Sequence, residues 1–145
     1  MHSVSQIAKY ILHEAGEMTT MKLQKLVFYC QAWSLAWDGE PLFPEDFEAW
    51  AGGPVCPELF RKHKGNFLID EDVFDGIADA DFTRDEIETI EAVLDTYNDK
   101  SPQWLSDKTH SERPWKEARG STAPGYPCSV VISKELIQDY YSGLY

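Results

Sequence analysis

Residues 22–33 read KLQKLVFYCQAW, and the apolar run that starts here decides the fold. From Leu26 to Trp37 only Gln31 and Ser34 are polar. The run is shorter than the roughly 20 apolar residues that a transmembrane helix needs. It also lacks the alternation of apolar and polar residues that indicates a strand. It therefore predicts a helix that is buried on most of its circumference at the centre of its domain.

Three residues of this helix share one face. Lys22, Lys25 and Tyr29 follow i, i+3, i+7 spacing, and residues so spaced lie on the same side of a helix. We expect this face to be where the helix reaches the surface, whereas Leu23 and Leu26 belong to the core. Two interpretations of the face stay open at this point, a solvated edge and the rim of a binding groove.

The rest of the chain predicts more helices and little strand. Residues 46–50 could be a short strand or a helical turn, and residues 129–132 are prone to strand. The expected fold is mainly α, a compact single-domain helical bundle over residues 1–145 around one central buried helix, with a small β ribbon. Capping residues and helix-starting prolines place the expected helix starts at Ser3, Thr19 or Thr20, Pro57, Thr83, Ser101, Pro114 and Ser133.

The composition is that of a folded protein of a reducing compartment. Hydrophobic residues make up 43% and aromatic residues 13% of the 145 residues, which excludes a disordered chain. The three cysteines form no spaced pattern, so we expect neither a disulfide framework nor secretion. The first residues do not read as a signal peptide. We therefore expect a cytoplasmic protein with no membrane contact.

The net charge of −12 is concentrated in one segment. Residues 70–99 hold 12 of the 25 acidic residues and a single base, Arg84. No basic stripe offsets this charge, so nucleic-acid binding is not expected. Glu88, Glu91 and Asp95 would form an acidic helix face that attracts a basic protein partner. The alternative is a solvated face that only aids solubility.

The sequence offers weak candidates for catalysis and metal binding. An enzyme would use His110 with Cys56 as nucleophile or Glu112 as partner, yet no catalytic motif accompanies them. A metal site would gather His63, His110 and cysteines from distant positions, with no closely spaced ligand pair. We expect no cofactor and no metal. His110 and Trp115 are instead predicted to tie two short helices together.

The glycine-rich stretch AWAGGPVCPEL is not a phosphate-binding loop. It lacks the lysine and the helix start that a nucleotide cradle requires. Gly53 and Pro54 favour a backbone turn, across which Trp50 can pack.

Two stretches together resemble a known family. KLQKLVFYCQAWSLAWDGEPLFPEDFEAWAGGPVCPELF and, later, THSERPWKEAR are similar to the Panacea domain, the SocA-like antitoxin family of bacterial and phage toxin–antitoxin systems. The likeness consists of an ordered set: a K-L-Q-K-L helix, a P-L-F turn, an acidic link to a tryptophan, G-P-V, and T-H followed by P-W. Residues 4–60 and 104–119 carry it. The motif residues expected to serve the structure are Leu23, Leu26, His110, Pro114 and Trp115.

The resemblance implies a protein that neutralises a cognate protein toxin by direct contact and is not an enzyme. A second interpretation is an adaptor or transcriptional partner of the same fold, with a protease or chaperone as partner. Self-association is a further expectation. An enzyme centred on His110 is the third interpretation. Interface hot spots favour Tyr and Trp. The candidate partner-binding residues therefore join aromatic side chains to the shared helix face, the G-P-V turn and the acidic face: Lys22, Lys25, Tyr29, Trp50, Gly53, Pro54, Val55, Glu88, Glu91, Asp95, Tyr140 and Tyr141.

Overall fold

A computed structural model describes residues 1–144, and its centre is helix α2, Thr20–Asp38. Every residue from Leu23 to Leu35 is buried, which confirms the helix surrounded by other elements. The hydroxyl of Thr19 accepts a hydrogen bond from the Lys22 amide at the start of α2. Gly39 ends the helix at φ 71°, a conformation that glycine adopts without penalty.

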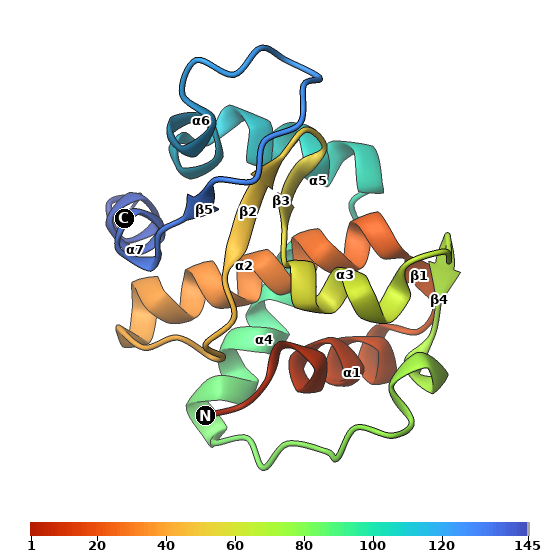
Figure 1. The fold of residues 1–145 in the computed structure, drawn as a ribbon. Helices are drawn as coiled ribbons and strands as arrows, with labels where there is room; N and C mark the ends of the chain where they lie inside the picture. The colour runs from red at the N-terminus through yellow and green to blue at the C-terminus, as the bar shows by residue number, and fades with distance from the viewer. Residues whose placement is uncertain (145) are drawn as a thin grey trace.

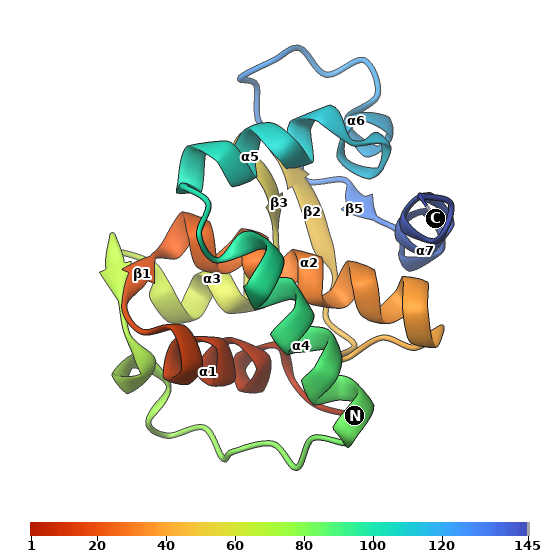
Figure 2. The same ribbon diagram turned by 180° about the vertical axis from the view of Figure 1, so that it is seen from behind.

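The other helices enclose α2 from several sides, so the fold is mainly α, as predicted (Figure 1). Helices α1 and α4 lie on one side of α2, while α5 and α6 lie beyond a β-hairpin on the other (Figure 2). Helix α7 makes its most extensive contacts with α2. The remaining helices are α1 (Val4–Ala15), α3 (Pro57–His63), α4 (Arg84–Tyr97), α5 (Pro102–Ser111), α6 (Arg113–Arg119) and α7 (Lys134–Ser142).

Two small antiparallel sheets complete the fold. The larger has the strand order β3-β2-β5 and contains β2 (Phe47–Trp50), β3 (Gly53–Val55) and β5 (Val131–Ile132). Its β2–β5 pairing, with Phe47 opposite Ile132, confirms the predicted ribbon and shows that residues 46–50 contain a strand. The smaller sheet pairs β1 (Met18–Thr19) with β4 (Leu68–Ile69). The acidic segment that starts at residue 67 therefore contains β4 and, after it, a 3-10 turn, η1 (Glu71–Phe74).

Aromatic side chains fill the space between α2 and its neighbours. Tyr29 stacks on Tyr97 of α4 with ring centroids 4.2 Å apart, and Phe28 meets Phe47 of β2 edge-on at 5.2 Å. Burial of each such side chain contributes about 1.5–3 kcal/mol to folding. One core cluster of buried residues joins helices from both ends of the chain. This cluster explains why an apolar α2 is stable.

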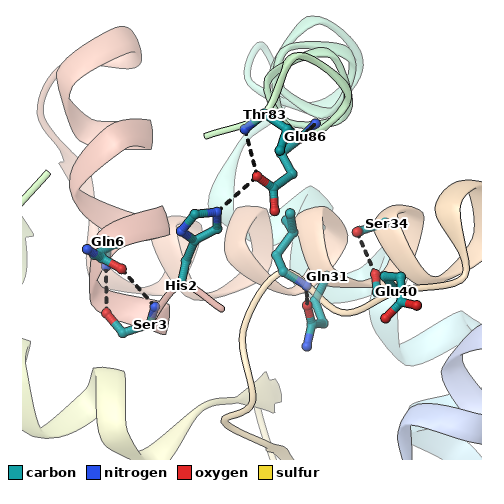
Figure 3. A network of polar contacts seen from close by, with 9 residues as sticks. His2, Ser3, Gln6, Gln31, Ser34, Glu40, Thr83 and Glu86 are labelled. Carbon is teal, nitrogen blue, oxygen red and sulfur yellow. Dashed lines mark hydrogen bonds and ion pairs between the residues drawn. The ribbon is translucent and has the colours of Figure 1, made fainter. Parts of the chain in front are cut away.

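Polar contacts fix the N-terminus and α4 relative to each other (Figure 3). Ser3 and Gln6 form a capping box at the predicted start of α1, and Thr83 and Glu86 form one at the predicted start of α4. The imidazole Nε2 of His2 lies 2.9 Å from the carboxylate of Glu86. The second capping box is thus linked to the segment that precedes α1, which holds the start of α4 beside the N-terminus.

A buried glutamine fixes the turn that follows α2 (Figure 3). The Gln31 amide donates to the Phe43 carbonyl at 2.8 Å and accepts from the Leu42 amide at 2.8 Å. Ser34 donates to the Glu40 carbonyl at 2.7 Å. The P-L-F turn is therefore held by α2 itself, and it sets the direction in which β2 leaves the helix.

Candidate functional site

The helix face expected at the surface is buried. Lys25 is 2% exposed and Tyr29 is fully buried, while only Lys22 is half-buried. The prediction of an exposed edge is therefore wrong for Lys25 and Tyr29. Helical spacing fixed the shared face correctly, but it could not show that β3, α5 and α4 cover that face.

The K-L-Q-K-L motif binds the backbone of the G-P-V segment and of Cys56, which follows it. The Gln24 side chain accepts from the Cys56 amide at 2.9 Å and donates to the Cys56 carbonyl at 3.3 Å. The Lys25 ammonium donates to the Pro54 carbonyl at 3.2 Å. Buried backbone groups that lack a strand partner need such bonds. Two motifs that are distant in the sequence therefore form one structural unit.

Gly53 makes this contact possible. Its φ is +123°, and a Cβ atom built there would lie 2.6 Å from Cε of Lys25 and 3.0 Å from Oγ1 of Thr109. Glycine alone fits both the backbone conformation and the space. Gly53 is therefore a packing position against Lys25 and α5. Pro54 and Val55 beside it are also buried.

Trp50 lies at the tip of the hairpin between two cavities. Its carbonyl accepts from the indole of Trp115 at 2.8 Å, and its own indole donates to Glu48 at 2.8 Å. Phe60 of α3 meets its ring edge-on at 5.1 Å. Trp50 borders a cavity of about 530 Å³ toward residues 125–129 and one of about 170 Å³ toward α2 and α3. Of the candidate contact residues, Trp50 is the one that reaches both openings.

The 530 Å³ cavity is closed on one side by the loop that follows α6. Arg119 is buried and donates to the carbonyls of Ala49, Ala123 and Tyr126 at 3.0, 2.9 and 2.7 Å. Tyr126 itself is 65% exposed. The arginine therefore holds a loop with an exposed aromatic side chain beside the hairpin.

His110 packs against Trp115, in the place predicted for a structural tie. The two rings stack with centroids 4.1 Å apart. Burial, and then the charge of Lys25, lower the pKa of His110, so the imidazole is neutral at pH 7. Its buried Nε2 has no hydrogen-bond partner among residues 1–144. Pro114, at the start of α6, is buried.

The candidate catalytic pairs do not form. Within residues 1–144 the thiol of Cys56 contacts Glu58 at 3.5 Å and makes no hydrogen bond to His110. Burial raises the pKa of Cys56 to about 12, which keeps it a thiol rather than the reactive thiolate. Residues 1–144 also contain no cluster of three or more His, Cys, Asp or Glu side chains that could hold a metal ion.

Glu112 binds two core tyrosines rather than His110. Its Oε1 accepts from the hydroxyls of Tyr29 at 2.7 Å and Tyr141 at 2.8 Å. Burial raises the pKa of Glu112, and the two tyrosine hydrogen bonds oppose this rise. Tyr141, a candidate partner-binding residue, is 1% exposed and therefore belongs to the core. Tyr140 is half-buried.

The acidic helix face has the position that the sequence predicted. Glu88, Glu91 and Asp95 are exposed on α4. Arg84 lies 3.2 Å from Glu88, an i,i+4 ion pair at the surface. Glu14 of α1 borders the same hollow as Glu91 and Asp95. Neighbouring acids thus reinforce a negative field on this side of the molecule.

Taken together, these contacts define a helical domain whose sequence motifs hold α2 to a β-hairpin. Residues 1–144 contain no helix with the length and apolarity needed to cross a membrane. The sequence profile described as "Antitoxin SocA-like, Panacea domain" matches residues 23–116, more than half of the chain. The chain belongs to this family. Searches of curated proteins and of solved structures gave no significant match.

The sequence did not reveal three residues that organise the region. Gln24 lies within the recognised motif, next to the apolar run of α2. A polar residue in that position could have indicated a buried side chain that needs a hydrogen-bond partner, but not that the partner is the backbone of Cys56. Glu112 and Arg119 flank Trp115 in a short charged tract, and nothing in their spacing distinguishes a buried charge from an exposed one. Glu112 accepts from Tyr29, 83 residues away in the chain, and Arg119 donates to Ala49, 70 residues away. Such pairings follow from the fold alone.

Proposed function

We propose that this chain is an antitoxin that neutralises a cognate protein toxin by direct binding. The observation that carries the proposal is the match of residues 23–116 to the SocA-like antitoxin family. The antitoxin unit is proposed to span residues 1–145, because α1 and α7, outside the matched range, both pack on α2. The proposed location is the cytoplasm, in keeping with three free cysteines.

The proposed role is binding without catalysis. The groups that an enzyme would use are engaged in the core: Cys56 is a buried thiol of high pKa, and Glu112 bridges two tyrosines. His110 is stacked on Trp115. A general base needs a substrate proton within hydrogen-bond reach. The neutralising role therefore falls to the surface.

The proposed contact surface lies around the hairpin tip. Trp50 borders two cavities there, and exposed apolar side chains follow in the neighbouring segment at Tyr126, Val130 and Val131. Aromatic side chains in such positions are typical anchors of protein interfaces. Glu88 and Glu91 lie on α4, where a negative field would accelerate association with a basic toxin. Lys25, Tyr29 and Tyr141 support this surface from the core.

Co-expression tests the proposal. The small open reading frame beside the antitoxin gene is expressed alone and together with this chain, and growth and complex formation are measured. We expect growth arrest by the toxin alone, rescue by co-expression, and one complex on size-exclusion chromatography. Rescue without a complex, accompanied by a shorter toxin half-life, would instead support the protease-adaptor interpretation. An open reading frame that is not toxic, or no rescue, would contradict the antitoxin role.

A further inference from the structure

A hollow of about 480 Å³ lies between the end of α2 and the start of α4. Trp37, Asp38 and Glu40 border it from the α2 side, and Asp85 borders it from α4. All four residues are exposed. The close-up of this region includes both sides, with Glu40 after α2 and Thr83 at the start of α4 (Figure 3). The hollow therefore combines an accessible aromatic ring with accessible acidic residues.

Trp37 is a large aromatic side chain that remains at the surface. It is 49% exposed, although its ring stacks on that of Trp33 with centroids 5.0 Å apart. Three other rings of the chain each have a cation of the same chain over them, 5.0–5.9 Å from the centroid: Lys100 over Trp104, Arg113 over Tyr140 and Arg119 over Trp115. Within residues 1–144 no cation lies over Trp37. Tryptophan is the ring that attracts cations best, so Trp37 can still accept one.

The acidic residues of the hollow also lack a cationic partner. None of the ion pairs in the described part of the chain includes Asp38, Glu40 or Asp85. Asp38 accepts a hydrogen bond at 3.4 Å from Thr89, which lies one turn after Asp85, so the two aspartates face the same side of α4. The last turn of α2 contains no basic residue, and the negative end of its dipole adds to the charge of Asp38. A cation in the hollow would therefore reduce the repulsion between these groups.

We propose that this hollow binds an arginine side chain of the protein toxin, whose guanidinium stacks on Trp37 and pairs with Asp38 and Asp85. The identity of the partner rests on the proposed antitoxin function; the arginine site itself does not. Arginine suits the hollow better than lysine, because a planar guanidinium both stacks on aromatic rings and donates several hydrogen bonds to carboxylates. Asp85 lies one turn before Glu88 on α4. The acidic face of α4 would thus steer a basic partner toward the hollow.

The site is tested first on the free chain. Acetyl-arginine amide and acetyl-citrulline amide, similar in shape and different in charge, are titrated into the isotope-labelled protein. The NMR shift of the Trp37 indole N–H is followed. We expect a saturable shift with the arginine probe and none with the citrulline probe. Lack of saturation with arginine, or an equal response to both probes, overturns the site.

Two pairs of substitutions remove the same charge from different places. Asp38→Asn with Asp85→Asn removes two carboxylates from the hollow, and Glu88→Gln with Glu91→Gln removes two from the neighbouring face of α4. All four residues are exposed, so both variants should fold. We expect the first variant to bind the arginine probe about tenfold more weakly and the second to stay within about twofold of wild type. Equal weakening by the two would show that only net charge matters, and it overturns the assignment to the hollow.

Trp37→Leu tests the aromatic contact. Leucine can still pack on Trp33 but offers no ring to a guanidinium. The probe is then followed at the backbone amide of Asp85. Loss of the cation–π contact should weaken binding about fivefold. An unchanged affinity contradicts the role of Trp37, and the two charge variants decide the site if Trp37→Leu does not fold.

The toxin is then tested separately. A charge pair that becomes enclosed in a complex acts mainly on dissociation, and a charge at the rim acts mainly on association. Asp38→Asn with Asp85→Asn should therefore raise the dissociation rate and the Kd of the toxin about tenfold, whereas Glu88→Gln with Glu91→Gln should only slow association. Arginine binding together with an unchanged toxin Kd for the first variant overturns the toxin contact. Arginine binding by a chain that rescues no toxin retains the arginine site and contradicts the antitoxin role.

Discussion

Replacement of Gly53 by alanine should destabilise the protein far more than replacement of its neighbour. The new Cβ would lie 2.6 Å from Cε of Lys25, inside van der Waals contact, at a φ of +123°. The lysine is enclosed, so it can make room only by leaving the Pro54 carbonyl. The K-L-Q-K-L helix and the hairpin would then separate at the point where the two motifs meet.

The expected size follows from two contributions. Alanine in a positive-φ conformation costs about 1 kcal/mol, and loss of a hydrogen bond to a charged group costs about 1.5–3 kcal/mol. Gly53→Ala should therefore lower the free energy of unfolding by about 3 kcal/mol. At about 2–4 °C per kcal/mol for a chain of this size, the Tm should fall by about 6–12 °C.

Two other glycines separate these contributions. Gly65 has φ +91° and open space around it, so Gly65→Ala measures the backbone strain alone and should cost about 1 kcal/mol. Gly52 has open space and no positive φ, so Gly52→Ala should stay within about 0.5 kcal/mol of wild type. Urea denaturation at constant m-value gives all three free energies. Equal losses for Gly53→Ala and Gly65→Ala would refute close packing against Lys25.

Three further outcomes are expected. His110→Ala should lower stability by about 2 kcal/mol, with toxin neutralisation in proportion to folded protein; unchanged stability with lost function would revive a catalytic role. The folded-state pKa of Glu112 lies above the ordinary 4.5, so wild type loses stability as pH rises from 4.5 through the raised value. The Tm of Glu112→Gln relative to wild type should therefore rise across that window, and a parallel pH profile would contradict this. Glu88→Lys with Glu91→Lys should slow toxin association about tenfold at low salt and leave dissociation unchanged; rates indifferent to salt and substitution would exclude steering.

Local signals predicted the elements that depend on local chemistry. The capping boxes at Ser3 and Thr83 and the apolar run of α2 each depend on a few neighbouring residues. The ribbon was predicted because residues 46–50 and 129–132 carry residues suited to a pleated surface. In each case the signal lies within a single helix or strand, even though the β2–β5 pairing itself joins distant segments.

Long-range contacts determined what the sequence could not show. Strands β1 and β4 have two residues each, and their pairing depends on segments about 50 residues apart rather than on strand propensity. The burial of Lys25 depends on the Pro54 carbonyl, and that of Glu112 on two tyrosines. Lysine and glutamate are rarely buried without partners. The sequence-based expectation that Lys25 is exposed was therefore reasonable but wrong, and nothing in the sequence indicated that Glu112 is buried.

The contact between α2 and α7 also affects how the chain folds during synthesis. On the order of 100 residues separate the two helices, which corresponds to about 5–20 s of translation. Throughout that interval the side of α2 that α7 later covers lacks Tyr141, which packs on Phe28 and Trp33 in the folded protein. A nascent or truncated chain therefore exposes aromatic surface that chaperones and proteases recognise. The supply of active protein should thus respond to the speed of elongation as well as to the rate of initiation.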